Sequence, residues 1–267
     1  MKLSTAIYSV ALLCAGNNVG AFSVLPQAQR SVSFQLNHHP GMGGTMEATG
    51  FIDTELRGAA MKLHTKMQSP KEGQVKDKPK PKEPYVTTHL DYLKFLVDSQ
   101  HVFQAFEEVV KMEELTSELS SFVDTGLERV ARLEEDIEFI SKEYNVERPE
   151  VGQKGETYAK EIREIASKGK EAIPEFMCHY YNYYFAHTAG GRMIGKRMAS
   201  LLLDKKVLEF YKWDGDLNKT KGAVKESIEK MAADWSREEK DMCVGATMGA
   251  FRGGGGINAY LGGGGHH

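Results

Sequence analysis

Residues 179–215 read HYYNYYFAHTAGGRMIGKRMASLLLDKKVLEFYKWDG, and this stretch decides the fold. Its composition is strongly helical, yet it contains the pair Gly190 and Gly191, with Gly195 one turn later. Each glycine inside a helix costs about 1 kcal/mol relative to alanine, so the pair indicates that a flat ligand or a second helix approaches the backbone closely. Tight helix packing or a simple kink would explain the same glycines.

A histidine lies in an apolar stripe further upstream. In the segment LRGAAMKLHTKM, one helical face carries Leu56, Ala60, Leu63, His64 and Met67. Taken alone, such a histidine is more often a core residue that is hydrogen-bonded to a backbone carbonyl than a metal ligand. Together with the glycine-bearing helix, it favours a ligand-binding role.

Two segments carry a resemblance to the plastid-type heme oxygenases of plants and algae. MKLHTKMQSPKEGQ, residues 61–74, resembles the proximal helix of that family, and residues 181–215 with WSREEKDMC at 235–243 form a longer and more specific match. Two further matching segments are YLKFLVDSQ, residues 92–100, and TGLERVARLEEDIEF, residues 125–139. The resemblance implies an all-α fold, a single helical domain in which heme is sandwiched between a proximal and a distal helix.

The resemblance also implies roles for individual residues around heme and its iron. His64 would be the axial ligand of the iron, a position that a neutral imidazole suits. Charge-assisted donors for the heme propionates would be Arg57, Tyr181, Lys221 and Lys225. The two lysines lie four residues apart and so share a helix face, although a solvated face would carry lysines too.

On the distal side, the resemblance places the peptide groups of Gly190 and Gly191 over the heme, where crowding directs oxygen towards the porphyrin ring. His187 stands where the animal pattern has an acid that orders distal waters, so it either bonds to such waters or serves packing alone. Ala186 replaces a glycine of that pattern. Phe251 matches an aromatic that packs near the macrocycle, and a plain core aromatic is the alternative.

The function so implied is oxidative cleavage of heme by O2 and reduced ferredoxin to biliverdin, carbon monoxide and iron, in support of bilin pigment synthesis. Nothing in the sequence resembles a flavin or iron–sulfur site, so the electrons must come from a partner. Residues 190–230 contain ten Lys or Arg against six Asp or Glu, a local net charge of +4. This favours docking of the acidic donor ferredoxin at Arg192, Lys196 and Arg197.

Two other classes of function stay open at this point. One is a non-catalytic regulator of the same fold that binds heme or another tetrapyrrole, and the presence of His64 counts against it. The other is a helical scaffold that binds no cofactor, in which His64 and the glycines serve packing alone.

The beginning of the chain differs from the rest. The first 46 residues contain Lys2 and Arg30 but no acidic residue, and residues 6–15 form an apolar run too short to span a bilayer. We expect a signal peptide at 1–21 and a plastid transit segment at 22–45, which would direct the protein to the chloroplast stroma. An ordinary secretory signal with a disordered start is the alternative.

Composition of the remainder indicates a mildly acidic, reduced protein. The net charge of −3 becomes −5 without the two positive charges of the first 46 residues, so strong nucleic-acid binding is not expected. We expect no membrane insertion of the mature protein. Cys178 and Cys243 have no metal-type spacing and form no disulfide framework, which fits a reducing compartment.

Helical periodicity predicts helices at 51–67, 88–112, 115–144, 156–170, 174–205 and 221–251. The stretch 69–84 is rich in Lys and Pro and predicts a polar surface linker inside a heme oxygenase domain at 46–251. Residues 252–267 are rich in glycine and predict a flexible tail.

Overall fold

The structure is a computed structural model of the whole chain, and it describes residues 50–66, 71–76 and 85–262. The described residues are all-α, as predicted: they form no β-strand, only one isolated bridge between Thr65 and Val75. No helix in these ranges is long and apolar enough to cross a lipid bilayer. The expected signal peptide and transit segment lie outside the described residues.

The described ranges contain the α-helices α1 Arg57–Leu63, α2 His89–Val109, α3 Thr116–Leu119, α4 Val130–Glu143, α5 Gln153–Ser167, α6 Ile173–Ala186, α7 Arg192–Leu202, α8 Leu217–Ala233, α9 Arg237–Gly245 and α10 Thr247–Asn258. Two π-helical turns are η1 Ile52–Leu56, which leads into α1, and η5 His187–Gly191, which joins α6 to α7. The 3₁₀ turns are η2 Glu113–Leu115, η3 Ser120–Phe122, η4 Lys170–Ala172, η6 Glu209–Tyr211 and η7 Ala259–Gly262.

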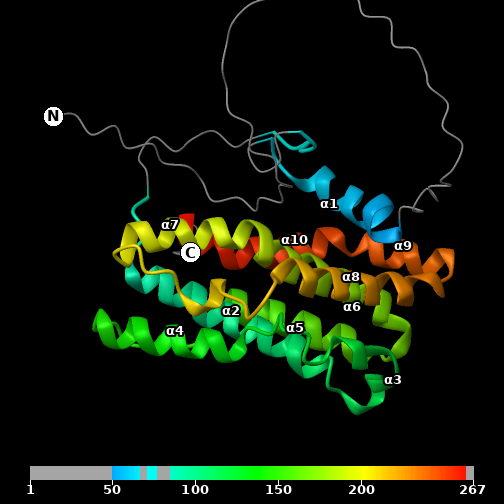
Figure 1. Cartoon of the computed structure of the whole chain (residues 1–267), viewed down its shortest axis with the longest axis horizontal. Coiled ribbons are helices and arrows are strands. Elements are labelled where there is room, and N and C mark those ends of the chain that lie inside the picture. Colours follow the sequence, from blue (N-terminus) through cyan, green and yellow to red (C-terminus); the bar gives the residue numbers. More distant parts are fainter. Residues whose placement is uncertain (1–49, 67–70, 77–84, 263–267) are drawn as a thin grey trace, which may run out of the picture.

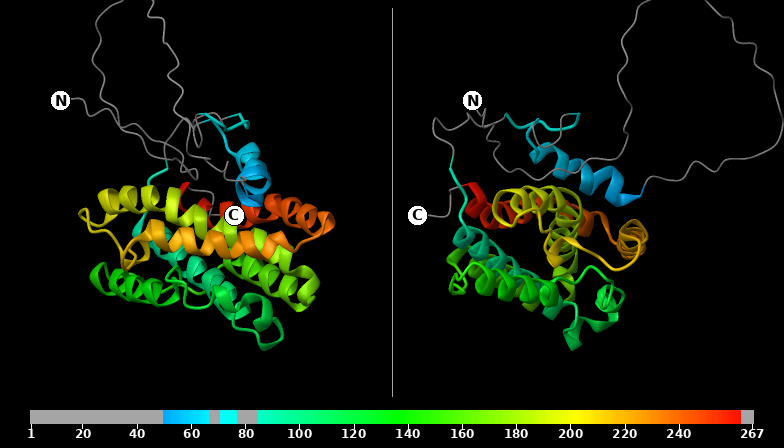
Figure 2. Two further views of the ribbon diagram at one scale, coloured as in Figure 1. Left: turned by 45° about the vertical axis from the view of Figure 1, so that its right-hand side comes forward. Right: turned by 60° about the vertical axis from the view of Figure 1, so that its left-hand side comes forward.

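The helices are stacked in layers, with α1 on the opposite side of the molecule from α4 (Figures 1 and 2). α2 packs against α4 and α5, and α6 packs against α9 and α10. α10 also contacts α1. The continuous helix made of α6, η5 and α7 lies between α1 on one side and the α2–α4–α5 layer on the other (Figures 1 and 2).

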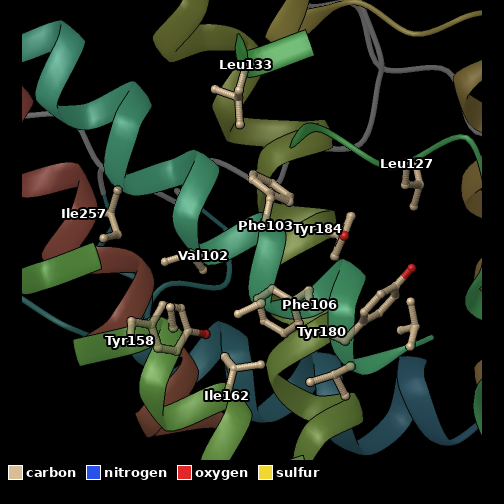
Figure 3. Packing of buried hydrophobic residues seen from close by; sticks show 14 of the residues in the cluster. Val102, Phe103, Phe106, Leu127, Leu133, Tyr158, Ile162, Tyr180, Tyr184 and Ile257 are labelled. Atoms are coloured by element: carbon tan, nitrogen blue, oxygen red, sulfur yellow. The ribbon is translucent and has the colours of Figure 1, made fainter. Parts of the chain in front are cut away.

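Aromatic rings fill the core between α2, α5 and α6 (Figure 3). Phe106 of α2 is fully buried and lies with its ring centroid 5.5 to 6.4 Å from the rings of Tyr158, Tyr180, Tyr183 and Tyr184. Edge-to-face and stacked pairs of this kind add to the free energy gained from burial. α2 is fixed at its start by a capping box between Thr88 and Asp91.

Several expected helix boundaries were wrong, because local backbone features end helices that periodicity alone continues. The stretch 115–144 is interrupted between η3 and α4, where Asp124 and Gly126 have φ of 52° and 86°, values that a right-handed helix excludes. The stretch 221–251 is divided into α8, α9 and α10, since the capping box of Ser236 and Glu239 starts a new helix after α8.

The prediction of a flexible tail was wrong for residues 252–262. α10 continues to Asn258, and Tyr260 and Leu261 in the following turn are buried. The Tyr260 hydroxyl donates to the buried carboxylate of Asp98 at 3.0 Å, and the Thr87 hydroxyl donates to the Leu261 carbonyl at 3.0 Å. Residues 263–267 lie outside the described part.

Residues 71–76, the described part of the surface linker predicted at 69–84, form a loop in which every residue except Gly73 is exposed. This segment folds back onto the end of α1 through hydrogen bonds from the amides of Gln74 and Val75 to the His64 carbonyl, at 2.9 and 3.0 Å. Glu72 also binds Arg57. The segment is polar, and backbone hydrogen bonds rather than apolar burial fix its position.

Two glycines of α10 provide a stability test. A Cβ at Gly253 would lie 2.3 Å from the Tyr158 ring, whereas a Cβ at Gly256 would meet nothing within 4 Å. We expect Gly253→Ala to lower the free energy of unfolding by about 1 to 3 kcal/mol through overpacking. Gly256→Ala should instead raise it by up to about 1 kcal/mol through helix propensity. Urea denaturation measures both, and equal effects would contradict the ordered helix.

Candidate functional site

His64 is the first residue after α1, not a residue on its helical face as predicted, and its backbone is extended with φ −75° and ψ 142°. Its Nδ1 lies 2.8 Å from the Ala60 carbonyl. Its own carbonyl accepts the two amides of the 71–76 segment described above. Both the ring and the backbone of His64 are thus held in place from within the chain.

The second ring nitrogen of His64 is unpaired. A carbonyl can only accept, so Nδ1 carries the proton in the neutral ring and Nε2 keeps a bare lone pair. Nε2 is buried, with the residue 1% exposed, and has no hydrogen-bond partner among the described residues. Buried polar atoms are rarely left unsatisfied, because this costs about 1 to 3 kcal/mol. The nitrogen fits the axial position of a heme iron, with the tautomer fixed by the other side of the ring.

A cavity of about 460 Å³ opens beside His64. Six residues that the sequence analysis expected around heme lie together on the wall of this cavity: Arg57, His64, Tyr181, Lys221, Lys225 and Phe251. The residues that the prediction did not assign to this wall are Asp53, Ala60, Met61, Asn182, Phe185, Ala186, Ala189, Asn218 and Gly222. The spacing of Asn182, Ala186 and Ala189 on one helix face was a usable signal for part of this set.

Cations gather at the cavity, and two of them are already paired. Arg57 donates from both terminal nitrogens to Glu72, at 3.0 and 2.6 Å, and this hydrogen bond raises the pKa of Arg57. Lys225 is paired with Asp53. Both pairs are partly exposed, so each contributes at most about 1 kcal/mol and can exchange for another carboxylate. Lys221 makes no ion pair within the described residues.

Phe251 of α10 closes the proximal side. Its ring meets the His64 ring edge to face, with centroids 5.1 Å apart. The ring also borders a second cavity of about 370 Å³, which shares Asn182, Ala186 and Phe251 with the first. The two cavities therefore adjoin across the distal helix, and Phe251 stands at their junction.

The glycines of the distal helix serve different purposes. Gly190 and Gly191 end the π-helical turn η5, and both are buried. A Cβ at Gly191 would lie 2.8 Å from Nδ1 of His187, so a side chain there would press on that ring. Gly195 instead accommodates the Tyr211 ring, 2.5 Å from where its Cβ would be, so this glycine serves packing. π-Turns are frequent at functional sites, which agrees with the position of η5 beside the second cavity.

His187 is buried and bonded through Nε2, which donates to the Phe210 carbonyl at 2.8 Å. The His187 and Phe210 rings stack with centroids 4.0 Å apart. Burial lowers the pKa of His187 to about 3, so the ring is neutral and Nδ1 is a bare acceptor beside Gly191. His187 and Gly191 both line the second cavity. The packing role expected as one alternative is thus filled by Nε2, while Nδ1 stays available.

Phe210, which sequence reasoning did not single out, contributes a carbonyl and a ring to the distal side. Its partner lies 23 positions earlier, and no local pattern marks such a contact. Of the three residues expected to dock a partner, Arg192 and Lys196 are exposed on α7. Arg197 is half-buried, and burial lowers the pKa of its guanidinium.

Comparison with known proteins decides the family, since the heme oxygenase model matches residues 53–253. The chain belongs to the heme oxygenase family. It is 40% identical over 232 residues to the chloroplastic heme oxygenase 1 of Arabidopsis thaliana, covering 86% of this chain and 78% of that protein. The resemblance to plant heme oxygenases is thereby confirmed.

Two further similarities are to a plant relative and to a solved bacterial structure. A protein of Arabidopsis thaliana named probable inactive heme oxygenase 2, chloroplastic, is 37% identical and covers 60% of this chain and 52% of its own. The crystal structure of heme oxygenase-1 from the cyanobacterium Synechocystis in complex with heme superposes with a TM-score of 0.54 at 22% identity, over 67% of this chain and 80% of that one. This last likeness supports the fold.

The depressed pKa of His187 predicts acid sensitivity. The unfolded chain binds a proton at this ring below its ordinary pKa of 6.5, whereas the folded chain binds one only near 3. Stability is therefore lost as the pH falls from 6.5 towards 3, by up to about 1.4 kcal/mol per pH unit. We expect the difference in unfolding free energy between wild type and His187→Gln to shrink with this slope when urea denaturation is followed from pH 7 to 5. A difference that does not change with pH would contradict a buried neutral ring.

Proposed function

We propose that this protein cleaves heme with O2 and reduced ferredoxin to biliverdin, carbon monoxide and iron, and that it supplies bilin pigment synthesis in a plastid. The unpaired, buried Nε2 of His64 carries the proposal. Membership of the heme oxygenase family and the chloroplastic name of the Arabidopsis relative support it. Heme is both the substrate and the group that carries the iron.

The proximal side would hold the substrate in two ways. Nε2 of His64 would hold the iron, and the orientation of the ring is preset by the Nδ1 bond to the Ala60 carbonyl. Lys221 would hold one propionate directly, and Arg57 and Lys225 would exchange Glu72 and Asp53 for the propionate carboxylates. Tyr181 adds a polar group and Phe251 an apolar wall on the same cavity. Charge-assisted bonds of this kind orient a planar substrate.

The distal side would control what reaches the iron. Bound heme supplies the metal at which O2 is activated and the porphyrin ring that is opened. Gly190 and Gly191 present backbone in place of side chains on the distal helix, and Gly191 lines the second cavity, so the helix backbone could approach the substrate closely. The bare Nδ1 of His187 can accept a hydrogen bond from a distal water and keep it ordered.

An external donor would dock at α7. Arg192 and Lys196 are exposed there, next to Met193, which is 54% exposed. A mixed basic and apolar face suits an acidic protein such as ferredoxin. Arg197 is less accessible and would contribute mainly to the local field.

A non-catalytic tetrapyrrole binder is the second candidate, because a relative bears the name probable inactive heme oxygenase 2. The binder and the enzyme would share the cavity and differ in turnover alone. The presence of His64, with its free Nε2, favours the enzyme.

Replacement of His64 tests the assignment. We expect His64→Ala to remove the axial bond, to change the Soret band of the hemin complex, and to abolish nearly all ferredoxin-driven biliverdin formation. His101→Ala, at a histidine of α2 that binds Glu156, is the matched control and should behave as wild type. Full activity of His64→Ala would defeat the proposal. If wild type binds hemin but does not turn it over, the non-catalytic tetrapyrrole binder would be the remaining candidate.

Charge reversal on α7 tests the donor site. We expect Arg192→Glu combined with Lys196→Glu to slow ferredoxin-driven turnover by about tenfold at low salt, since association loses its steering. Turnover driven by ascorbate should stay unchanged. Lys160→Glu, on α5, is the control at a distant exposed lysine. Unaltered ferredoxin-driven turnover in the double variant would show that the donor does not dock at α7.

A further inference from the structure

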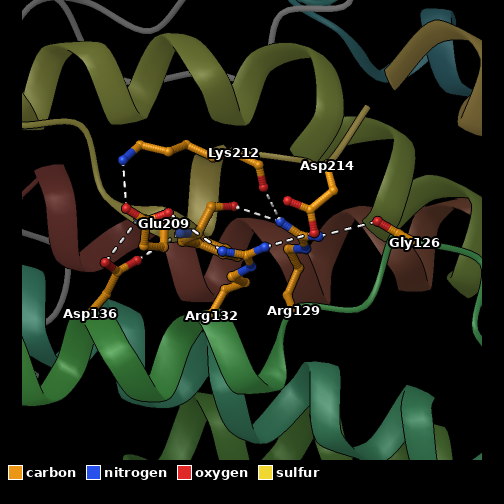
Figure 4. A network of polar contacts seen from close by, with 8 residues as sticks. Gly126, Arg129, Arg132, Asp136, Glu209, Lys212 and Asp214 are labelled. Carbon is orange, nitrogen blue, oxygen red and sulfur yellow. Dashed lines mark hydrogen bonds and ion pairs between the residues drawn. The ribbon is translucent and has the colours of Figure 1, made fainter. Parts of the chain in front are cut away.

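Asp136 of α4 is a buried carboxylate whose two oxygens bind the backbone of one short turn. Oδ1 accepts from the amide of Glu209 at 2.9 Å, and Oδ2 accepts from the amide of Phe210 at 2.7 Å (Figure 4). Only 3% of the residue is exposed. Desolvation raises the pKa of Asp136 to about 6, so the charged form is held at a cost that the two amide bonds only partly offset. The two bonds fix the backbone of Glu209 and Phe210 to α4.

The same turn is held a second time from the start of α4. The guanidinium of Arg129, also 3% exposed, donates to the carbonyl of Lys212 at 2.6 Å and to that of Gly126 at 3.2 Å. Its Nη1 lies 3.5 Å from the Phe210 carbonyl. Figure 4 shows both side chains reaching from α4 to this segment. One residue, Phe210, is therefore bonded on both sides of its peptide backbone.

Phe210 passes this constraint to the distal helix. Its carbonyl accepts Nε2–H of His187, and its ring stacks on the imidazole at 4.0 Å with an angle of 17° between the planes. If the Phe210 carbonyl moved away, nothing else among the described residues would fix which nitrogen of His187 carries the proton. A neutral imidazole has two tautomers of similar energy, and hydrogen bonding selects between them.

We infer that Asp136 is a positioning residue for the distal side: through the backbone of Phe210 it holds His187 as the Nε2–H tautomer, with its bare Nδ1 turned towards the second cavity. The inference rests on the proposed function for the meaning of that acceptor. The tautomer itself is a property of the heme-free protein. A neutral amide at position 136 would not serve, because it offers one acceptor oxygen to two amide donors and presents its own N–H to one of them.

The test is nitrogen-15 NMR of histidine-labelled, heme-free full-length protein. We expect wild-type His187, assigned by loss of its signals in His187→Gln, to show a protonated Nε2 and an unprotonated Nδ1. Asp136→Asn should replace this pattern with a mixture of tautomers, and Asp136→Glu, which keeps both acceptor oxygens, should restore it. A wild-type ring protonated at Nδ1 overturns the inference even if Asp136→Asn does not fold. So does an unchanged tautomer in Asp136→Asn, or a mixture in Asp136→Glu equal to that in Asp136→Asn.

Activity gives a second readout. Asp136→Asn should bind hemin with unchanged affinity and lose about tenfold in biliverdin formation, as expected when an outer partner of a site residue is removed. Asp214→Asn is the control, since Asp214 is 94% exposed on the segment that follows the same turn. Equal loss in both variants would overturn the positioning role. Absence of biliverdin from wild type would instead defeat the proposed function and leave the NMR result standing.

Discussion

The hydrogen bond between Nδ1 of His64 and the Ala60 carbonyl is the constraint on which the site depends. It fixes the tautomer and leaves Nε2 buried, without a hydrogen-bond partner among the described residues. Everything around it maintains that state: the 71–76 segment holds the His64 backbone, and Phe251 holds the ring edge. The free energy for leaving one buried nitrogen unpaired is provided by the aromatic core beneath the distal helix.

The two histidines of the site are arranged as opposites. His64 uses Nδ1 for a carbonyl and leaves Nε2 available, whereas His187 uses Nε2 and leaves Nδ1 available. In each case an acceptor that cannot donate selects the tautomer, and a main-chain carbonyl provides a fixed position for it. The available nitrogens border two adjoining cavities that share Phe251. The two residues thus differ in which ring nitrogen is left without a partner among the described residues.

Sequence reasoning reached the parts of the structure that have a local signal. The helix predicted at 174–205 is continuous from α6 through α7, and four-residue spacing brought Lys221 and Lys225 to one wall. It failed for residues 252–262. A high glycine content lowers helix propensity, but it does not reveal that Gly253 is needed because the Tyr158 ring packs where a Cβ would be. Asp136 was beyond reach as well, since its partners lie 73 and 74 positions away and no pattern of spacing encodes such a bond.

The contact between His64 and Phe251 can form only late in synthesis of the chain. His64 directly follows α1 and Phe251 lies in α10, so that α2 to α9 lie between them in the sequence. A ribosome releases α1 early and α10 late, and segments fold as they emerge. A nascent chain therefore exposes His64 long before Phe251 arrives to cover its ring. The part of the cavity wall that Phe251 forms is therefore complete only after α10 has folded.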